Sequence, residues 1–252
     1  MTDDYSGLFS RREAAREAAF SSIWRDDLDN VFSEIFESYD SANHYASLFL
    51  WDKLRRDFVN SIRLESGYKV LDLCAGTNAV GMDLLARNPD IEVTAMERNA
   101  PMLRLGTQKA DNQGLVIAPV IGDAHDLPFP DSYFDVVTIQ WSTRHLLVAR
   151  AFTEVRRVLK PGGCLYIQDL MRPQSRIIET AYRWFLTGSL WVVSRLFRVG
   201  PSALKCRSYF TEAIRQFYSV DEFSALLEEL GFVGVTGKSL LSGTVGTNKA
   251  CK

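Results

Sequence analysis

Residues 69–81, KVLDLCAGTNAVG, constrain the fold more than any other stretch of the chain. The stretch begins with a short, nearly continuous apolar run, as expected of a parallel strand that is buried on both faces. Small residues around Gly76 follow, and they let a ligand approach the backbone closely. Apolar residues then recur at helical spacing. The stretch therefore predicts a buried strand, a tight turn and a helix whose N-terminal N–H groups attract an anionic group.

The residues of this turn favour one class of nucleotide ligand over another. A dinucleotide turn carries three glycines, G-x-G-x-x-G, so that a pyrophosphate can lie against it. This turn has Gly76 and Gly81, with Asn78 where the second close glycine would fall. Asp72 is a poor neighbour for a phosphate but a good acceptor for a cationic amino group. A ligand with an amino-acid end and no phosphate, such as S-adenosylmethionine, fits both facts.

Two further acidic residues stand at the ends of predicted strands. Residues 91–96 alternate like a second strand, and Glu97 at its tip is placed to accept both hydroxyls of an adenosine ribose. Residues 115–121 form a third apolar run before Asp123. We expect the Asp123 carboxylate to accept from an adenine amino group while Ala124 offers its backbone to the ring.

The following residues continue the alternation of strands and helices. Residues 134–140 read as a fourth strand and lead into the loop 141–146. Ligands of open α/β sheets bind at the carboxyl ends of strands, so we expect the reacting group of a substrate near this loop. Residues 148–159 predict a helix that is stopped by proline and capped by glycine within 160–163. Residues 164–170 predict the fifth strand.

The N-terminal part of the chain is predicted to be helical. Residues 1–30 are charged and alanine-rich, which suits a surface helix with Ala15 and Ala19 on one face and Glu13 and Arg16 on the other. We interpret it as an arm that packs on the domain, with a mobile cover over the active site as the alternative.

Residues 31–63 are also helical in pattern and rich in aromatic residues. The polar stretch 39–43 predicts a turn between two helices. Most of the aromatic side chains are expected to pack in the core. Tyr39 and Asn43 stand beside the first strand, where they could contact a ligand.

Residues 172–201 interrupt the alternation of strands and helices. They contain many apolar and aromatic residues, with arginines among them. This composition predicts an amphipathic helix or pair of helices. It suits a hydrophobic lid over a bulky substrate or a face that rests on a membrane, with plain packing as the alternative. Residues 221–230 predict a last helix, and 232–238 and 241–248 predict a terminal hairpin.

Composition excludes several classes of function. The net charge of -2 gives no support to nucleic-acid binding. The four cysteines are far apart, and Cys74 and Cys164 lie in apolar runs where a cysteine is usually a small hydrophobe, a pattern that suits a reducing cytosol. With three histidines we expect no metal site. Neither a secretory signal nor a membrane span is recognisable, so we expect a cytoplasmic protein.

The motifs, in their order and spacing, resemble those of class I S-adenosylmethionine-dependent methyltransferases. The matching stretches are VLDLCAGTNAVG, Glu97, GDAHDLPFPDSYFDVV and EVRRVLKPGG, within about residues 65–172. The resemblance implies an α/β fold with a Rossmann-like seven-stranded sheet and helices on both faces. It divides the chain into an N-terminal helical cap, 1–64, and a methyltransferase domain, 65–252, with a helical lid at about 173–205 before the last strands.

The resemblance also implies S-adenosylmethionine as the methyl donor and S-adenosylhomocysteine as the product. It assigns cofactor binding to the first turn, to the tip of the second strand and to the ends of the third and fourth strands. The residues concerned are Asp72, Cys74, Ala75, Gly76, Asn78, Glu97, Arg98, Met102, Gly122, Asp123, Ala124, Gln140 and Trp141.

A narrower resemblance is to the UbiE/COQ5 family, which C-methylates prenylated quinols in quinone biosynthesis. Its matching residues span most of 31–252, and the family carries a glycine at the position of Asn78 and an Arg-Asn pair at the position of Arg144 and His145. We expect Arg144 to stabilise the oxyanion that develops on the acceptor and His145 to accept its proton. The residues expected to contact the acceptor are Tyr39, Asn43, Tyr182, Phe185 and Tyr209.

Three functions stay open at this point. The first is C-methylation of a prenylated phenol or quinol of the demethylmenaquinol or ubiquinol-precursor type, with peripheral membrane contact through 182–198. The second is O-, N- or C-methylation of a small secondary metabolite on the same frame. The third is a repurposed S-adenosylmethionine-binding protein. A homodimer is compatible with each of them.

Overall fold

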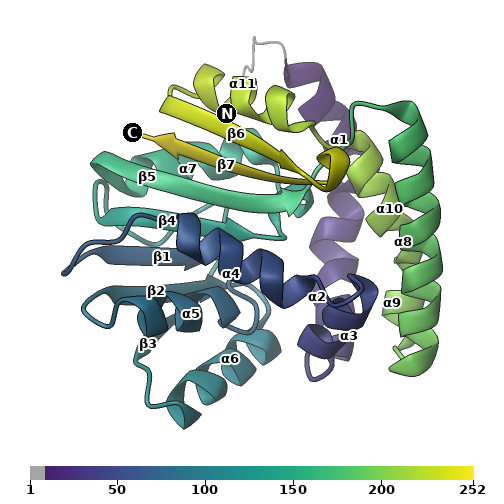
Figure 1. Ribbon diagram of the computed structural model, residues 1–252, viewed down its shortest axis with the longest axis horizontal. Coiled ribbons are helices and arrows are strands. Elements are labelled where there is room, and N and C mark those ends of the chain that lie inside the picture. Colours follow the sequence, from purple (N-terminus) through teal and green to yellow (C-terminus); the bar gives the residue numbers. More distant parts are fainter. Residues whose placement is uncertain (1–8) are drawn as a thin grey trace.

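The computed structural model describes residues 9–252. Residues 1–8, which belong to the predicted arm and cap, lie outside the described residues. Seven strands form one sheet in the order β3-β2-β1-β4-β5-β7-β6 (Figure 1). Strands β1 to β5 pair with one another in parallel, and β7 is antiparallel to both of its neighbours, β5 and β6. The strands are β1 (Lys69–Leu73), β2 (Glu92–Glu97), β3 (Ile117–Ile121), β4 (Phe134–Gln140), β5 (Leu159–Leu170), β6 (Val233–Leu240) and β7 (Val245–Cys251).

Helices cover both faces of this sheet, which confirms the predicted α/β architecture. One face packs against α4 (Trp51–Ser61), α5 (Ala79–Arg87) and α6 (Ala100–Asn112) through a buried cluster that includes Phe58 and Leu84. The other face packs against α7 (Val148–Val158) and α11 (Val220–Glu229) through a second cluster that includes Phe152 and Phe223. The central strands are buried on both sides, which explains their continuous apolar runs.

A layer of helices lies beyond the ends of the strands, on the side toward which β5 points (Figure 1). The long α8 is its outermost helix. The layer contains α1 (Ser10–Ser22), a π-helical turn η1 (Ile23–Asp27), α2 (Leu28–Ile35), α3 (Tyr39–Ala46), α8 (Arg176–Leu196), α9 (Pro201–Lys205) and α10 (Arg207–Gln216). The predicted turn at 39–43 is wrong, because these residues form the first part of α3. The chain breaks instead on either side of α3.

The predicted orientation of the first helix is also wrong. Glu13 and Arg16 are buried, whereas Ala15 and Ala19 are exposed. Glu13 and Arg16 form an ion pair with each other, and Arg16 is fully buried. Charged groups can be buried when they are paired and hydrogen-bonded. The charge pattern alone therefore predicted the wrong buried face for this helix.

The glycines that were expected to cap α7 belong to the sheet instead. The helix ends at Val158, and β5 begins at the next residue. Gly162 has φ of +80°, a conformation that favours glycine. Its N–H donates to the carbonyl of Lys252 at 3.0 Å, so the turn pairs with the end of the chain.

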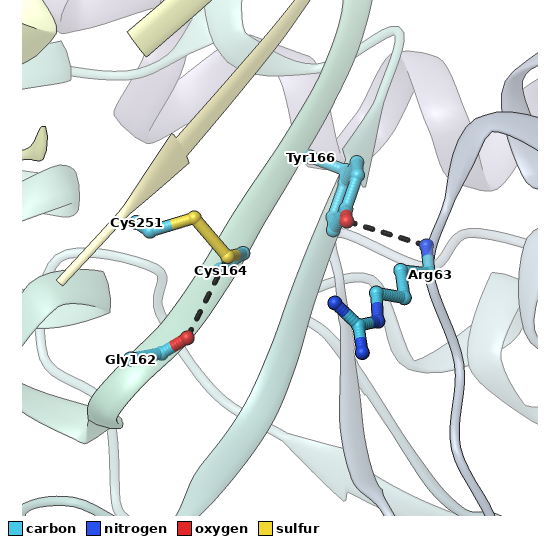
Figure 2. The surroundings of a disulfide bond; sticks show 5 residues. All are labelled: Arg63, Gly162, Cys164, Tyr166 and Cys251. Atoms are coloured by element: carbon cyan, nitrogen blue, oxygen red, sulfur yellow. Dashed lines mark hydrogen bonds between the residues drawn. A yellow bond between two sulfur atoms is a disulfide. The ribbon is translucent and has the colours of Figure 1, made fainter. Parts of the chain in front are cut away.

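A disulfide joins Cys164 on β5 to Cys251 on β7 (Figure 2). The two residues are direct partners in the antiparallel register. The expectation that Cys164 is an ordinary small hydrophobe is therefore wrong, and the inference of a reducing compartment loses its basis. Sequence spacing could not reveal this pair, because the cysteines lie 87 residues apart and meet only when β7 inserts beside β5.

Hydropathy of the helices gives one further result. Among the described residues, no helix combines the length and the apolar character that a membrane crossing requires.

The disulfide predicts both a thiol count and a response to reduction. Cys74 and Cys206 are free, so the unfolded but unreduced protein should titrate two thiols, and the reduced protein four. Because the bond closes a long loop in the unfolded chain, reduction should lower the free energy of unfolding by about 2–4 kcal/mol. Urea unfolding with and without reductant measures this difference.

The variant Cys251→Ser is the matched control for this measurement. It should unfold at the urea concentration of the reduced protein and show no further response to reductant. Titration of four thiols without reductant would contradict the disulfide.

Candidate functional site

Two adjoining hollows lie at the carboxyl ends of β1 and β4. The smaller, here called the turn hollow, has a volume of about 40 Å³ and lies against the turn after β1. The larger, here called the apolar cavity, has a volume of about 450 Å³ and lies between α2, α3, α8 and α10. Six of the predicted cofactor residues line the turn hollow, namely Asp72, Cys74, Ala75, Gly76, Gln140 and Trp141.

Asp72 is a buried carboxylate at the floor of the turn hollow. Its side chain is 2% exposed, and it accepts hydrogen bonds from the Thr138 hydroxyl at 2.8 Å and the Gly81 N–H at 3.2 Å. Burial raises the pKa of Asp72 to about 7. A carboxylate with this burial gains from a cationic partner, because such a partner compensates the lost hydration.

Glu97 ties the tip of β2 to the turn after β1. Its carboxylate accepts from the backbone N–H groups of Gly76 at 3.0 Å, Arg98 at 2.8 Å and Asn99 at 2.9 Å. Burial raises the pKa of Glu97. Glu97 does not itself line the turn hollow, so the structure brings it to the turn through backbone hydrogen bonds.

Asn78 stands at the N-terminus of α5 with φ of +60°. Asparagine tolerates this left-handed region better than most residues, which explains how it can occupy a position where the resemblance leads us to expect glycine. Its side chain is buried against α6, where a Cβ at Gly106 would come within 2.8 Å of the Asn78 side chain. Gly106 therefore leaves the space that Asn78 fills.

The remaining predicted cofactor residues lie around the tips of β2 and β3, outside the turn hollow. Asp123 accepts from the ring Nδ1 of His125 at 2.6 Å, and this hydrogen bond holds the pKa of Asp123 well below its usual range. The side chain of Arg98 turns away, to Asp29 at 3.0 Å. Met102 packs beneath Gly76, and Gly122 and Ala124 flank Asp123 on the chain.

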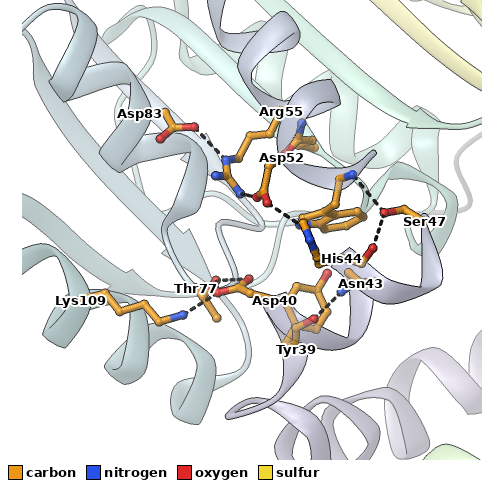
Figure 3. Close-up of polar contacts among 12 residues, drawn as sticks. Tyr39, Asp40, Asn43, His44, Ser47, Asp52, Arg55, Thr77, Asp83 and Lys109 are labelled. Atoms are coloured by element: carbon orange, nitrogen blue, oxygen red, sulfur yellow. Dashed lines mark hydrogen bonds and ion pairs between the residues drawn. The ribbon is translucent and has the colours of Figure 1, made fainter. Parts of the chain in front are cut away.

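Sequence reasoning missed a polar contact between the helical layer and the turn (Figure 3). Asp40 on α3 accepts from the Thr77 hydroxyl at 2.9 Å and pairs with Lys109 at 2.5 Å. Asp40, Thr77 and Arg55 all line the turn hollow. Asp40 falls within 39–43, so interpreting that stretch as a turn concealed its role. Within residues 9–252, no cluster of His, Cys, Asp and Glu side chains could hold a metal ion.

The apolar cavity brings together six of the seven predicted acceptor residues. They are Tyr39, Asn43, Arg144, His145, Tyr182 and Phe185. Tyr209 is the exception, since it is buried behind His145 and does not line the cavity. The lid expected within 172–201 supplies Leu186, Leu190 and Val193 of the apolar wall, but sequence reasoning missed Val31, Phe32, Ile35 and Phe210. The missed residues come from two helices far apart in the sequence, α2 and α10, so no single stretch displays them.

Four residues, Tyr39, Trp51, Trp141 and Ser142, line both the turn hollow and the apolar cavity. The rings of Trp51 and Trp141 stack with centroids 4.9 Å apart. Trp141 also has φ of +62°, an uncommon conformation for a bulky residue. The backbone bends sharply here, at the point where the two hollows meet.

The turn η2 (Thr143–His145) presents two of the predicted residues to the cavity. Arg144 forms an ion pair with Asp169, which is fully buried at the end of β5, and donates to the Trp141 carbonyl at 2.6 Å. Its Nε has no hydrogen-bond partner. The guanidinium is thus held rigidly and keeps one donor unused.

His145 neither faces solvent nor has a carboxylate beside it. Its Nδ1 lies 2.5 Å from the hydroxyl of Tyr209, and its Nε2 has no partner. Burial and the nearby guanidinium groups of Arg144 and Arg16 lower the pKa of His145 well below its usual value. A neutral imidazole therefore stands at the cavity wall at physiological pH.

The N-terminal helix holds this loop in place. Arg16 donates to the carbonyls of Arg144 and Leu146, each at 3.0 Å, and so brackets His145 on both sides. Glu13, its ion-pair partner, accepts from the Val148 N–H at 2.7 Å. The described part of the arm therefore packs on the domain, as predicted, through these charged groups as well as through the buried side chains of Phe9 and Phe20.

Comparisons with known proteins show the family and the fold. The model of the ubiE/COQ5 methyltransferase family matches residues 22–252. The demethylmenaquinone methyltransferase of Symbiobacterium thermophilum is 30% identical, over 88% of this chain and 91% of that protein. The demethylmenaquinone methyltransferase of Lactiplantibacillus plantarum is 33% identical, over 83% and 89%. A crystal structure of a SAM-dependent methyltransferase from Aquifex aeolicus shares the fold, with a TM-score of 0.55 at 19% identity, over 79% of this chain and 88% of that chain.

The raised pKa of Asp72 predicts how stability depends on pH. In the unfolded chain the carboxyl loses its proton near pH 4, whereas in the folded protein it keeps the proton until about pH 7. The folded state therefore binds more protons across this window, and stability should fall as pH rises from 4 to 7, by about 4 kcal/mol. Urea unfolding at a series of pH values, compared between wild type and Asp72→Asn, measures the contribution.

Asp72→Asn is the control as well as the test, because it keeps the shape and removes the charge. The difference in unfolding free energy between the two proteins should change across the window and become constant above about pH 7. Parallel curves for the two proteins would contradict the buried, protonated carboxyl.

Proposed function

The chain belongs to the ubiE/COQ5 methyltransferase family, and on that premise we propose that it C-methylates a phenol or quinol of the demethylmenaquinol or ubiquinol-precursor type. It is an S-adenosylmethionine-dependent methyltransferase. Support for the acceptor comes from the large apolar cavity that shares a wall with the turn hollow. A small polar metabolite would leave most of this cavity unfilled, so the second candidate function receives less support.

The residues at the turn fit S-adenosylmethionine. The buried carboxylate of Asp72 suits the cationic amino group of its amino-acid end. Glu97 would accept from the ribose hydroxyls after releasing the Gly76 N–H, and Asp123 with Ala124 would hold the adenine. The bound cofactor would supply an activated methyl group on a sulfonium, near the wall formed by Trp141 and Ser142.

We place the reacting hydroxyl of the acceptor at Arg144 and His145. Methyl transfer from a sulfonium is an in-line displacement, so the protein contributes mainly by holding the two reactants in line. In such a displacement the acceptor's ring carbon would form a bond to the methyl carbon as the carbon–sulfur bond breaks and leaves its electron pair on sulfur. The ring then loses a proton to water and regains its aromatic character. Arg144, rigidly held by Asp169, would stabilise the oxyanion on the acceptor.

The apolar side chain of the acceptor would occupy the wall made by α2, α3 and α8. A cavity of about 450 Å³ lies within the range of ligand sites, and such sites bury most of their ligand against apolar side chains. Tyr182 and Phe185 are stacked on α8 at 6.2 Å and would contact this side chain. Asn43 lines the same wall from α3, where its amide donates to the Tyr39 carbonyl at 2.9 Å, and it would contact the acceptor there.

We further propose that the outer face of α8 rests on an anionic membrane. Its large apolar side chains are exposed, above all Ile177, Trp184, Trp191 and Leu196. Arg195 lies over the Trp191 ring at 4.9 Å, and basic residues beside exposed aromatic ones suit anionic lipid. The exposed Leu48 and Phe185 also line the apolar cavity, so this face is continuous with the place proposed for the tail.

The proposed acceptor predicts a chain-length effect. Ser194 lines the apolar cavity from α8, so Ser194→Phe would take up space needed by a long prenyl tail. We expect kcat/KM to fall by about 10- to 100-fold for long-chain demethylmenaquinols and to change little for short-chain ones. Methylated product from S-adenosylmethionine, measured by mass spectrometry over a series of chain lengths, gives the comparison.

Ser189→Phe is the matched control, since Ser189 lies on the same helix but does not line the cavity. It should leave the chain-length profile unchanged. Binding of S-adenosylmethionine without turnover of any quinol would contradict the proposed acceptor, and turnover of small polar acceptors alone would favour the second candidate function.

The membrane proposal predicts sedimentation with vesicles. The wild type should sediment with phosphatidylglycerol-containing vesicles, and Trp184→Glu should reduce the bound fraction several-fold, because it places a negative charge in the apolar face. Val116→Glu is the control, since Val116 is 87% exposed just ahead of β3, far along the sheet from α8. A dimer in solution that Trp184→Glu separates, with no vesicle binding by the wild type, would show that a second copy covers the face instead.

A further inference from the structure

We infer that His145 acts on the acceptor as a hydrogen-bond donor through Nε2–H, and that Tyr209 and Trp24 are positioning residues that fix this tautomer. The inference rests on the proposed function, in which an oxygen of the acceptor lies at Arg144 and His145. It corrects the expectation that His145 accepts the proton of the acceptor.

The direction of the hydrogen bonds follows from counting hydrogens, beginning at Trp24. The indole Nε1 of Trp24 can only donate, and it lies 2.7 Å from the Tyr209 hydroxyl. The hydroxyl oxygen therefore accepts this hydrogen and keeps its own hydrogen to give. Its other partner in the described chain is Nδ1 of His145, at 2.5 Å.

The Tyr209 hydroxyl must then donate to Nδ1. If Nδ1 carried a hydrogen instead, two hydrogens would point at one phenol oxygen, and the buried hydroxyl hydrogen would have no acceptor. Burial also raises the pKa of Tyr209, so this hydroxyl keeps its hydrogen. A neutral imidazole that accepts at Nδ1 carries its hydrogen on Nε2.

The surroundings keep the imidazole neutral. The guanidinium groups of Arg144 and Arg16 disfavour a charge on His145, and their own counterions, Asp169 and Glu13, are paired with them. The ring also contacts Tyr209 and Phe210 on α10 and Phe32 on α2, and none of these brings a negative charge. Among the described residues, no unpaired carboxylate therefore lies near the ring to stabilise its protonated form.

Three residues that line the cavity each hold a buried nitrogen donor that has no acceptor in the described chain. The donors are Nε2 of His145, Nε of Arg144 and Nε1 of Trp141, all from residues 141–145. A wall that offers donors without acceptors suits an oxyanion, because each unpaired donor gains a charge-assisted hydrogen bond as charge develops. It does not suit a proton acceptor, since a protonated Nε2 has no free electron pair. The acceptor hydroxyl would therefore lose its proton to water, and the product oxygen would take one back from water after the ring has lost its own proton.

The π-helical turn η1 gives Trp24 its position in this arrangement. Trp24 is buried in this turn, between α1 and α2. Turns of this kind are frequent at functional sites. The carbonyl of Trp24 also accepts from Arg98 at 2.6 Å. Since Arg98 follows Glu97 at the tip of β2, one tryptophan contacts both sides of the site.

His125 provides an internal reference for the measurement. Its Nε2 accepts from the Leu147 N–H at 3.0 Å, and its Nδ1 lies against the Asp123 carboxylate. A neutral His125 must therefore carry its hydrogen on Nδ1, the opposite tautomer to the one inferred for His145. The chain has only three histidines, so their ring nitrogens can be distinguished in one spectrum.

Long-range proton–nitrogen spectra of the ¹⁵N-histidine-labelled full chain at neutral pH test the tautomer. The signals of His145, identified by their loss in His145→Gln, should show a protonated Nε2 and an unprotonated Nδ1. In Tyr209→Phe and in Trp24→Phe this preference should be lost, whereas the matched substitution Tyr133→Phe, at the far end of β4, should leave it intact. An unprotonated Nε2 in the wild type would overturn the inference.

Kinetics with a quinol acceptor test the role of the donor. A glutamine side chain can place an N–H near the position of Nε2 but is no base. His145→Gln should keep kcat within about tenfold of wild type, whereas His145→Ala should lose about 10²–10³-fold. Tyr209→Phe should lower kcat by up to about 10²-fold with little change in KM.

Equal loss in His145→Gln and His145→Ala would overturn the donor role. The tautomer is measured without any acceptor, so its failure is distinguishable from failure of the proposed function. A wild type with the expected spectrum and no turnover of quinols would contradict the acceptor assigned above and leave the tautomer standing.

Discussion

The buried ion pair of Glu13 and Arg16 organises the acceptor side of the site. Removing one partner of such a pair leaves an uncompensated buried charge, at a cost of about 3–5 kcal/mol. The pair also satisfies the backbone on both sides of His145, since Arg16 binds the carbonyls of Arg144 and Leu146. These contacts tie the form of the loop to α1. The N-terminal helix is thus a structural component of the proposed active site.

The same stretch of chain connects the acceptor side to the cofactor side. From α1 it continues through the turn η1, where Trp24 donates to Tyr209 and accepts from Arg98. Farther along, Asp40 on α3 contacts Thr77 in the turn after β1. The first helices therefore bind both the loop that would hold the acceptor and the turn that would hold the cofactor. Holding two reactants in line requires such a rigid connection.

The sequence predicts this fold better than it predicts the site. The strand at 134–140 and the turn at Gly76 were predicted correctly, because local apolar spacing and small residues determine them. Local spacing could not predict three other features, namely the burial of Arg16, the bond between Cys164 and Cys251, and the role of Tyr209. Each depends on a partner more than 60 residues away, and local patterns contain no information on such partners.

The two departures from the family pattern have different physical consequences. Asn78 occupies a left-handed position that asparagine tolerates, and Gly106 leaves room for its side chain, so the shape of the turn is kept. His145, where the resemblance to the family leads us to expect asparagine, introduces a ring with two nitrogens, and only one tautomer presents a donor at Nε2. The substitution is therefore functional only together with Tyr209, which fixes the tautomer. Asn78 preserves an existing geometry, whereas His145 depends on a second residue for its chemistry, and we expect the acceptor side of this enzyme to be where it differs from its relatives.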